Sequence, residues 1–393
     1  MKQEKQMPGI DEEQLLKPVL THIKHKLMIL SGKGGVGKST IAACLAIALA
    51  KKGNKVGLLD IDLHGPSIPH LLNIPDILNI SPEQKVLPKE IMPNLEVVSM
   101  ECLMVDKDQA VIWRGPLKHT AIRQFIGDVQ WGDLDYLVVD SPPGTGDEPL
   151  SIAQLIPEAK AIIVATPQEV ALADVRKSIT FCHEVDMDIA GIIENMSGFI
   201  CPHCGKEVDI FKTGGGEKTA LASHVEFLGK LPFDLGVVEA GDAGKLVKYM
   251  ERENNPYNKA IFQIVDRLIQ RLKEMEIKPV SLNEIRGKNS YKVTIPLKDG
   301  KPAPFLTNCD QIAMVHVKDG QIKKVEHIAP AEQGPIRPKV FVDLGADLVM
   351  TTEMKEKAKY VFYKNKVGVV LDIPDASPEE LVEKFIKGEL GSK

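Results

Sequence analysis

This chain of 393 residues has little cysteine and no apolar run long enough to cross a bilayer. A membrane-spanning helix needs about 20 consecutive apolar residues. The N-terminal stretch MKQEKQMPGI also lacks the apolar core of a signal peptide. The 6 cysteines are too few and too scattered for a disulfide framework, so a neighbouring pair indicates metal or redox chemistry. We therefore expect a cytoplasmic protein with no membrane partner.

Excess positive charge is absent as well. The formal net charge is -5, from 49 Lys and Arg against 54 Asp and Glu, so we expect no nucleic-acid partner. Hydrophobic residues make up 44% of the chain and charged residues 26%, as in an ordinary globular protein. The length exceeds one average domain and suits two.

Short apolar runs alternate with helical segments in the N-terminal part of the chain. The runs are almost continuously apolar, which is typical of strands covered on both faces of a sheet. This pattern predicts an α/β fold with a doubly wound, mostly parallel sheet. The predicted interior strands are 27–30, 56–60, 95–98, 136–140, 161–165 and 189–193.

A change of pattern predicts a domain boundary. A charged helix over 256–275 closes the first unit, and the next residues are polar without a clear period. Beyond them, alternation over 291–295 and the turns Asp299-Gly300 and Asp319-Gly320 favour a smaller α/β domain. We expect a tail at 1–24, a first domain at 25–275, a linker at 276–289 and a second domain at 290–393.

A complete P-loop motif, SGKGGVGKST from Ser31 to Thr40, lies between the first predicted strand and a helix. Its glycines let backbone N–H groups face a phosphate, and the helix start adds the positive end of its dipole. Lys38 would reach the β- and γ-phosphates, and the Ser39 hydroxyl would ligate magnesium. We expect ATP and Mg²⁺ as cofactors, bound through Gly32, Gly34, Gly35, Val36, Gly37, Lys38, Ser39 and Thr40.

Aspartates end two of the predicted strands. Asp60 and Asp62 follow the second strand, and Asp140 ends a strand of the Walker B type. Doubly wound sheets hold their ligands at the carboxyl ends of the strands. We expect Asp62 to orient the attacking water, Asp60 to support the magnesium shell and Asp140 to hold magnesium through a water molecule. Strand-end aspartates often only cap a helix, but beside a P-loop they predict an ATPase.

Lys33, the second lysine of the P-loop, resembles the signature lysine of the MinD, ParA and nitrogenase-iron-protein group. In that group the residue reaches across a dimer interface to the partner's nucleotide. The resemblance implies a homodimer in which Lys33 joins Lys38 and Asp62 in catalysis. A solvated loop lysine is the alternative.

Further motifs resemble the Mrp/ApbC subfamily of P-loop ATPases, over about Lys24 to Met250. They are IDLHGPS at 61–67, WRGP at 113–116, DSPPGTGD at 140–147, NMSGF at 195–199, CPHCG at 201–205 and GGGEK at 214–218. Members of that subfamily are ATP-dependent iron–sulfur cluster carriers that assemble clusters or deliver them to client apoproteins. The resemblance implies that Asn195 contacts the adenine base and that Cys201 and Cys204 ligate the cluster.

The Cys201 and Cys204 pair has the chemistry of a soft-metal site. Thiolates suit iron–sulfur clusters or zinc. A cluster takes about four of them, so two facing subunits would bridge one 4Fe–4S cluster. Zinc shared across the same dimer, a dithiol redox pair and a pair without ligand are the alternatives. His203 is interpreted as a solvated spacer rather than a ligand.

The segment 290–393 resembles the small α/β domain of proteins that bind the nitrogenase iron–molybdenum cofactor or its precursors. Strands at 291–296, 313–318 and 347–350 and helices at 335–344 and 378–387 carry the likeness. The His-Phe-Gly segment usual in that family is replaced here by Pro304-Phe305-Leu306. Cys309 is either a substitute metal ligand or a small buried hydrophobe, in which case the domain is a docking module without metal.

The leading hypothesis is therefore an ATP-dependent iron–sulfur carrier, with client apoproteins as partners. A MinD/ParA-like positioning ATPase is the alternative from another class. It calls for a C-terminal amphipathic membrane helix or a basic DNA-binding face. The residues 385–390 are too short for such a helix, and the cysteine pair would have no role. A zinc-bridged scaffold for metal-cofactor assembly is a third hypothesis.

Overall fold

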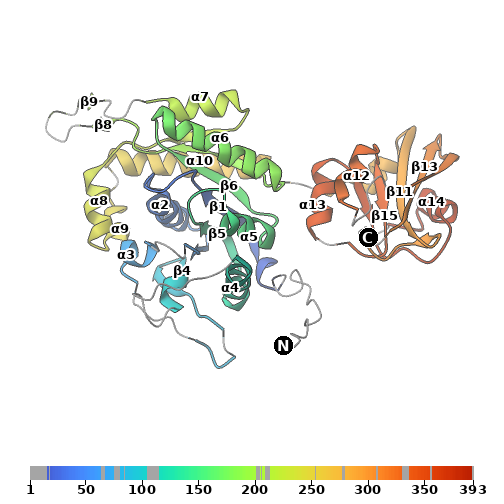
Figure 1. Cartoon of the computed structure of the whole chain (residues 1–393), viewed down its shortest axis with the longest axis horizontal. Coiled ribbons are helices and arrows are strands. Elements are labelled where there is room, and N and C mark those ends of the chain that lie inside the picture. The colour runs from blue at the N-terminus through green and yellow to red at the C-terminus, as the bar shows by residue number, and fades with distance from the viewer. Residues whose placement is uncertain are drawn as a thin grey trace, which may run out of the picture. The chain divides into compact units, whose positions relative to one another are not determined.

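The computed structural model divides the chain into two compact units, Met1–Met275 and Glu276–Lys393 (Figure 1). Each unit contains hydrophobic core residues of its own. Among the described residues, no helix is both long enough and apolar enough to cross a membrane. The structure describes residues 16, 18–62, 67–74, 80–83, 85–103, 115–200, 204, 206–208, 213–252, 254–276, 279–306, 309–329, 336–354 and 356–391.

The first unit alternates strands and helices along the chain. Its elements are β1 (Ile23–Leu30), α2 (Lys38–Lys51), β2 (Val56–Asp60), α3 (Ile68–Leu72), β3 (Lys89–Met92), β4 (Leu95–Ser99), η1 (Met100–Leu103), α4 (Gly115–Asp128), β5 (Leu134–Asp140), α5 (Asp147–Leu155), β6 (Lys160–Ala165), α6 (Glu169–Glu184), β7 (Ile189–Glu194), β8 (Phe199–Ile200), β9 (Glu207–Val208), α7 (Gly215–Ala222), β10 (Phe227–Lys230), α8 (Leu235–Asp242), α9 (Leu246–Tyr249) and α10 (Pro256–Glu274).

An eight-stranded sheet runs through this unit in the order β10-β7-β6-β1-β5-β2-β4-β3. Neighbouring strands are parallel except the edge pair β3 and β4. The chain leaves β1 towards β2 on one side and later returns to β6 on the other, so β1 lies where the strand order reverses. In such sheets ligands bind at that point, at the carboxyl ends of the strands. The predicted doubly wound fold is confirmed.

Burial explains why these segments form a sheet covered by helices. All five residues of β2 are buried, as expected for a strand covered on both faces. Helix α10 buries Ile261, Ile264, Val265, Leu268 and Leu272, which recur at helical spacing on one face. Helix α2, by contrast, is buried at every position from Ile41 to Ala50. It lies against β5 and α10 and carries the P-loop at its N-terminus.

Strand β1 begins earlier than the apolar run 27–30 predicted. Its first residues pair with β5, from Ile23 opposite Leu134 onwards. The extension includes Lys26, which is buried and forms an ion pair with Glu158 at 2.8 Å. A buried lysine with a carboxylate partner is compatible with an interior strand. However, the lysine interrupts the apolar pattern from which the strand was predicted.

The second unit is a smaller α/β fold around a sheet in the order β14-β13-β11-β15-β16, with β12 beside β11. Strand β11 pairs antiparallel with β13 and parallel with β15. Alternate β11 residues, including Val293 and Ile295, join one core with Phe385, while Phe341 and Phe362 belong to a second core cluster. The elements are α11 (Leu282–Arg286), β11 (Ser290–Lys298), β12 (Lys301–Pro302), β13 (Gln311–Lys318), β14 (Gln321–Ile328), α12 (Pro338–Asp343), β15 (Leu348–Met350), α13 (Glu356–Lys364), β16 (Gly368–Val370) and α14 (Pro378–Ile386).

The expected linker 276–289 differs from the structure at its C-terminal end. Helix α11 lies inside that range, and its Ile285 is fully buried in the core that contains Phe385. One apolar side chain in a polar segment was not enough to predict a helix, because Phe385 of the same core lies far along the chain.

Candidate functional site

The P-loop curls between β1 and α2 in a conformation that needs glycine. Gly35 and Gly37 have positive φ angles of 78° and 83°, which side-chain-bearing residues rarely adopt. Gly37 is the N-cap of α2, and a Cβ atom there would lie 2.4 Å from Asn195 Nδ2. A Cβ atom at Gly32 would lie 2.5 Å from Asp174 on α6. Close packing therefore requires glycine at Gly32 and Gly37. The positive φ angles favour glycine at Gly35 and Gly37 as well.

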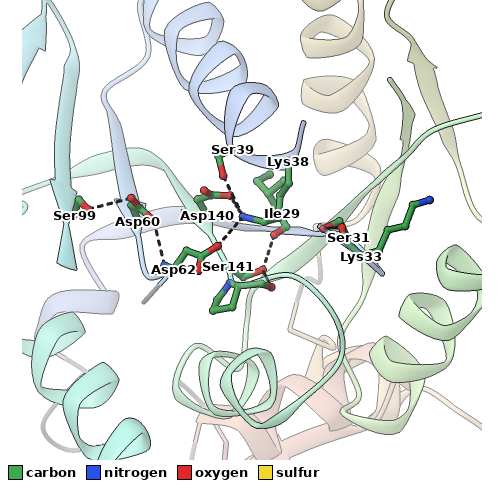
Figure 2. A network of polar contacts seen from close by, with 11 residues as sticks. Ile29, Ser31, Lys33, Lys38, Ser39, Asp60, Asp62, Ser99, Asp140 and Ser141 are labelled. Carbon is green, nitrogen blue, oxygen red and sulfur yellow. Dashed lines mark hydrogen bonds and ion pairs between the residues drawn. The ribbon is translucent and has the colours of Figure 1, made fainter. Parts of the chain in front are cut away.

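Lys38 lies among strand-end carboxylates at the base of the loop (Figure 2). Its Nζ atom donates to Asp140 Oδ1 at 2.6 Å and lies 4.0 Å from Asp62 Oδ2. It also donates to Ser39 Oγ at 3.3 Å. Lys38 is 6% exposed and Asp140 is fully buried. Strands β2 and β5 are neighbours with Asp60 opposite Asp140, so the sheet register brings these carboxylates together.

Asp60 is held by groups on both sides. Its Oδ1 accepts the Asp62 N–H at 3.1 Å, and its Oδ2 accepts the Ser99 hydroxyl at 3.0 Å. Burial, followed by the nearby Asp140 charge, raises the pKa of Asp60 well above its usual value. Ser99 ends β4, and the sequence analysis did not identify it. In the sequence, Ser99 is marked only as a polar residue at the carboxyl end of an apolar strand.

The Asp140 carboxylate has an oxygen that fits a metal ion or its water. Burial raises the pKa of Asp140, and the Lys38 charge opposes that rise. Its Oδ2 atom is buried and has no hydrogen-bond partner among the described residues. Such an atom is costly unless a cation or water serves it. With Ser39 beside Lys38, the oxygen donors suit Mg²⁺, which takes oxygen ligands and retains waters.

Lys33 points away from this cluster. Figure 2 shows its side chain extending in the direction opposite to Lys38 and Asp140. The side chain is partly exposed, and the Lys33 carbonyl accepts the Ser31 hydroxyl at 3.0 Å. The loop backbone is thus fixed while the ammonium group is directed outwards.

The Walker B loop is tied to the P-loop strand by two hydrogen bonds. The Ser141 hydroxyl donates to the Ile29 carbonyl at 2.7 Å, and the Gly144 N–H donates to the Ser31 carbonyl at 2.8 Å. A movement of either loop is therefore transmitted to the other through these hydrogen bonds.

A cavity of about 150 Å³ opens beside the N-terminus of α2. Asn195 lies in its wall, and its Nδ2 atom donates to the Val36 carbonyl at 2.8 Å. Asp234 shapes another wall, because its carboxylate accepts the Tyr249 hydroxyl at 2.7 Å and caps α8. The lining residues include Gly37, Thr40, Asn195, Pro232, Phe233, Asp234, Val237 and Tyr257. The segment after β10, which supplies Pro232, Phe233 and Asp234 to this cavity, was not predicted from the sequence.

Only part of the predicted cysteine motif can be placed. Cys204 is exposed and free, and it lies in the sequence between β8 and β9, which form a two-stranded antiparallel pair. Cys201 and His203 lie outside the described residues, as do His64, Trp113 and Arg114 of the other motifs. Within the described part of the chain, no group of three or more His, Cys, Asp or Glu side chains could hold a metal ion.

The other cysteines lie in cores. Cys44, Cys102 and Cys182 are buried. Cys309, in the second unit, is half-buried and donates to the Leu306 carbonyl at 3.2 Å. Burial raises the pKa of Cys309 to about 11, so the thiol is protonated at neutral pH when no metal is bound.

Comparisons with known proteins point to one family. The family model ParA, described as NUBPL iron-transfer P-loop NTPase, matches residues 22–269. The iron-sulfur cluster carrier protein of Methanocaldococcus jannaschii is 48% identical over 251 residues, which cover 63% of this chain and 87% of that protein. The cytosolic Fe-S cluster assembly factor CFD1 of Eremothecium gossypii is 48% identical over 237 residues, which cover 58% of this chain and 84% of that protein.

A solved structure agrees with these matches. The nucleotide-binding protein of Archaeoglobus fulgidus in complex with ADP has a TM-score of 0.54 and 38% identity, over 60% of this chain and 93% of that one.

Proposed function

This chain belongs to the ParA family of NUBPL-type iron-transfer P-loop NTPases, and from that premise we propose that it is an ATP-dependent iron–sulfur cluster carrier. It binds and hydrolyses ATP with magnesium and transfers a 4Fe–4S cluster to client apoproteins in the cytoplasm. The observation that carries the proposal is the presence, in one domain, of the Lys38 carboxylate cluster and an exposed Cys204. The names of the relatives, iron-sulfur cluster carrier protein and Fe-S cluster assembly factor, support it.

The nucleotide site uses groups that are already in position. Lys38 exchanges its contact with Asp140 for the β- and γ-phosphates, and the P-loop N–H groups hold the remaining phosphate oxygens. Asp140 and Ser39 would hold Mg²⁺, which would supply positive charge beside the phosphates. Asp62, beside Lys38, orients the attacking water, and Asp60 fixes the Asp62 backbone through its hydrogen bond. Asn195 contacts the adenine base in the adjacent cavity.

The active form is a homodimer. Lys33 points away from its own site (Figure 2), in the direction expected of a lysine that completes the partner's site. Cys201 and Cys204 of two subunits supply about four thiolates, the number that one cluster needs. Nucleotide turnover changes how the subunits meet, and with it how firmly these thiolates hold the cluster.

We assign the second unit a docking role in client choice. It lies beyond residues 22–269 that the family model matches, and it is a separate compact unit with a sheet of its own. The docking role assigns no metal to Cys309, whose thiol donates to the Leu306 carbonyl.

Anaerobic reconstitution with iron and sulfide tests the proposal. We expect about four irons and four sulfides per dimer with the absorption of a 4Fe–4S cluster. The Cys201→Ser/Cys204→Ser variant should lose both, whereas Cys309→Ser, a matched control in the second unit, should keep them. An undiminished cluster in the double variant would exclude the proposed ligands. Stoichiometric zinc in place of iron would favour the zinc-bridged scaffold.

A further inference from the structure

Strand β7 ends in a carboxylate that has no part in the phosphate site. Glu194 is fully buried. Its Oε1 atom accepts the Ser197 hydroxyl at 2.5 Å and the Gly214 N–H at 2.9 Å, and its Oε2 atom accepts the Gly216 N–H at 2.5 Å. A buried carboxylate is tolerated when hydrogen bonds replace its water shell, and three donors do so here.

The glycines of the GGGEK motif are shaped for this carboxylate. Gly214 is the N-cap of α7 and has a positive φ of 79°. A Cβ atom at Gly216 would lie 3.0 Å from Glu194 Oε2. The first N–H groups of a helix and its dipole favour a negative charge at this place. The GGGEK motif thus binds the Glu194 carboxylate of the same chain, a role that requires no nucleotide.

The donors flank the cysteines in the sequence. Ser197 precedes β8 and Gly214 follows β9, so the chain between them, residues 198–213, carries Cys201 and Cys204. We call residues 198–213 the cysteine segment. Glu194 therefore holds the chain on both sides of this segment through one side chain. The Gly198 carbonyl, at its start, also accepts the Phe233 N–H at 2.8 Å, beside the nucleotide cavity.

The next residue, Asn195, contacts the P-loop. Its side chain donates to the Val36 carbonyl, and its own N–H donates to the Ala165 carbonyl of β6 at 2.7 Å. The side chains of two adjacent residues thus hold the P-loop, through Asn195, and the cysteine segment, through Glu194. If the adenine base displaces Asn195, the backbone of the neighbouring Glu194 must move with it. Otherwise the hydrogen bonds of Glu194 resist the displacement.

We propose that Glu194 is a positioning residue that couples the nucleotide cavity to the cysteine segment. Its carboxylate holds both ends of the segment, so a shift of Asn195 changes the reactivity of Cys204. This inference rests on the proposed function, in which Cys204 helps to hold the cluster. Glutamine at this position retains one acceptor oxygen, but its amide NH₂ meets an N–H donor where Oε2 accepted one.

The test measures the reactivity of Cys204 in the full-length, cluster-free, reduced protein. Every variant carries Cys201→Ser, so that the segment contains one thiol. Alkylation of Cys204 by N-ethylmaleimide is followed by peptide mass spectrometry at fixed pH, without nucleotide and with saturating ADP and Mg²⁺. The parent should react about fivefold or more slowly with nucleotide, the lower end of common coupling between sites. Glu194→Gln should bring the ratio of the two rates close to one while its affinity for ADP stays within about twofold.

Glu217→Gln is the matched control, since Glu217 is exposed in the first turn of the same helix. It should keep the parental ratio, and a purely structural role of Glu194 would change both rates without changing their ratio. If Glu194→Gln does not fold, Ser197→Ala removes one of the three donors and should give an intermediate ratio. A parental ratio in Glu194→Gln or, failing its folding, in Ser197→Ala overturns the inference, as does a parent that ignores nucleotide.

The outcome is separable from that of reconstitution. Alkylation uses cluster-free protein, so a parent without a cluster can still show nucleotide-dependent Cys204 reactivity that Glu194→Gln abolishes. Conversely, a stable cluster with a nucleotide-insensitive Cys204 would sustain the carrier function and reject the coupling.

Discussion

Lys38 Nζ lies 2.6 Å from Asp140 Oδ1, and both side chains are buried. The P-loop lysine is thus neutralised by the aspartate that ends the Walker B strand. Because a lysine has three donors, it can exchange this contact for phosphate oxygens without leaving its place. The Asp140 carboxylate that it releases is then available to a metal ion.

Lys38→Met should destabilise the nucleotide-free protein. It leaves Asp140, Asp60 and Asp62 without their cation, and breaking a buried pair from one side costs about 3 to 5 kcal/mol. Protonation of the carboxylates relieves the repulsion, so the loss should shrink as the pH falls. Urea unfolding at pH 8 and pH 5 measures it, with Lys51→Met, an exposed position on the same helix, as control. A loss that is equal at both pH values would contradict this account of the cluster.

Asp60→Asn should stabilise the nucleotide-free protein at high pH. The pKa of Asp60 is raised by burial and by Asp140, so the folded state binds a proton that the unfolded state releases. Stability therefore falls as pH rises from the ordinary carboxyl pKa to the raised one. The variant removes this term, and we expect a gain of about 1 to 2 kcal/mol at pH 8, a typical single-substitution effect.

The gain should shrink as the pH falls towards 4, close to the ordinary carboxyl pKa, because the unfolded state then also begins to bind the proton. Unfolding free energies across pH 4 to 8 give the difference between variant and parent. Asp266→Asn, at a position 64% exposed, serves as control and should show no such trend. A difference that does not grow with pH would mean that Asp60 is ionised at little cost.

The fold and the phosphate site could be predicted because both follow from local rules. Apolar runs mark buried strands, and the carboxyl ends of parallel strands meet at one edge, which brings Lys38, Asp60 and Asp140 together. Ser99 and Glu194 could not be predicted in the same way. Their partners depend on which strands are neighbours and on a loop twenty residues away, and neither leaves a pattern in the sequence.

The same limit applies to elements that are buried by residues far away in the sequence. The start of β1 and helix α11 contain polar residues, so neither follows an apolar period. Lys26 is buried because Glu158 pairs with it, and Ile285 because the Phe385 core receives it. Both contacts join segments far apart in the chain.

Asn195→Ala should weaken ADP binding about tenfold, the effect of a hydrogen bond worth about 1.4 kcal/mol, and reduce discrimination between ADP and GDP. Asn195 also holds the Val36 carbonyl, so the base contact must be separated from loop positioning. Pyrophosphate, which has no base, provides this control. Calorimetry should show pyrophosphate affinity close to that of the parent. An equal loss for pyrophosphate and ADP would assign Asn195 to the P-loop alone.

Lys33 and Asp62 should complement each other when they are on different subunits. Lys33→Ala and Asp62→Asn homodimers should each hydrolyse ATP at least about a hundredfold more slowly than the parent, as expected for loss of a charge-stabilising or water-orienting group. In a mixed dimer, the subunit with Lys33→Ala retains its own Asp62 and receives the partner's lysine. Its site is complete, while the other site lacks both groups.

Mixing equal amounts of the two variants should therefore restore about a quarter of the parental rate, since about half of randomly formed dimers are mixed and each contains one complete site. Lys38→Ala mixed with Lys33→Ala should behave in the same way, because Lys38 acts within its own subunit. Two inactive variants that each lack Lys33 give no complete site and are the negative control. If Lys33 acted on its own nucleotide, neither site of a mixed dimer would be complete and no mixture would recover activity. The outward direction of its side chain (Figure 2) favours recovery.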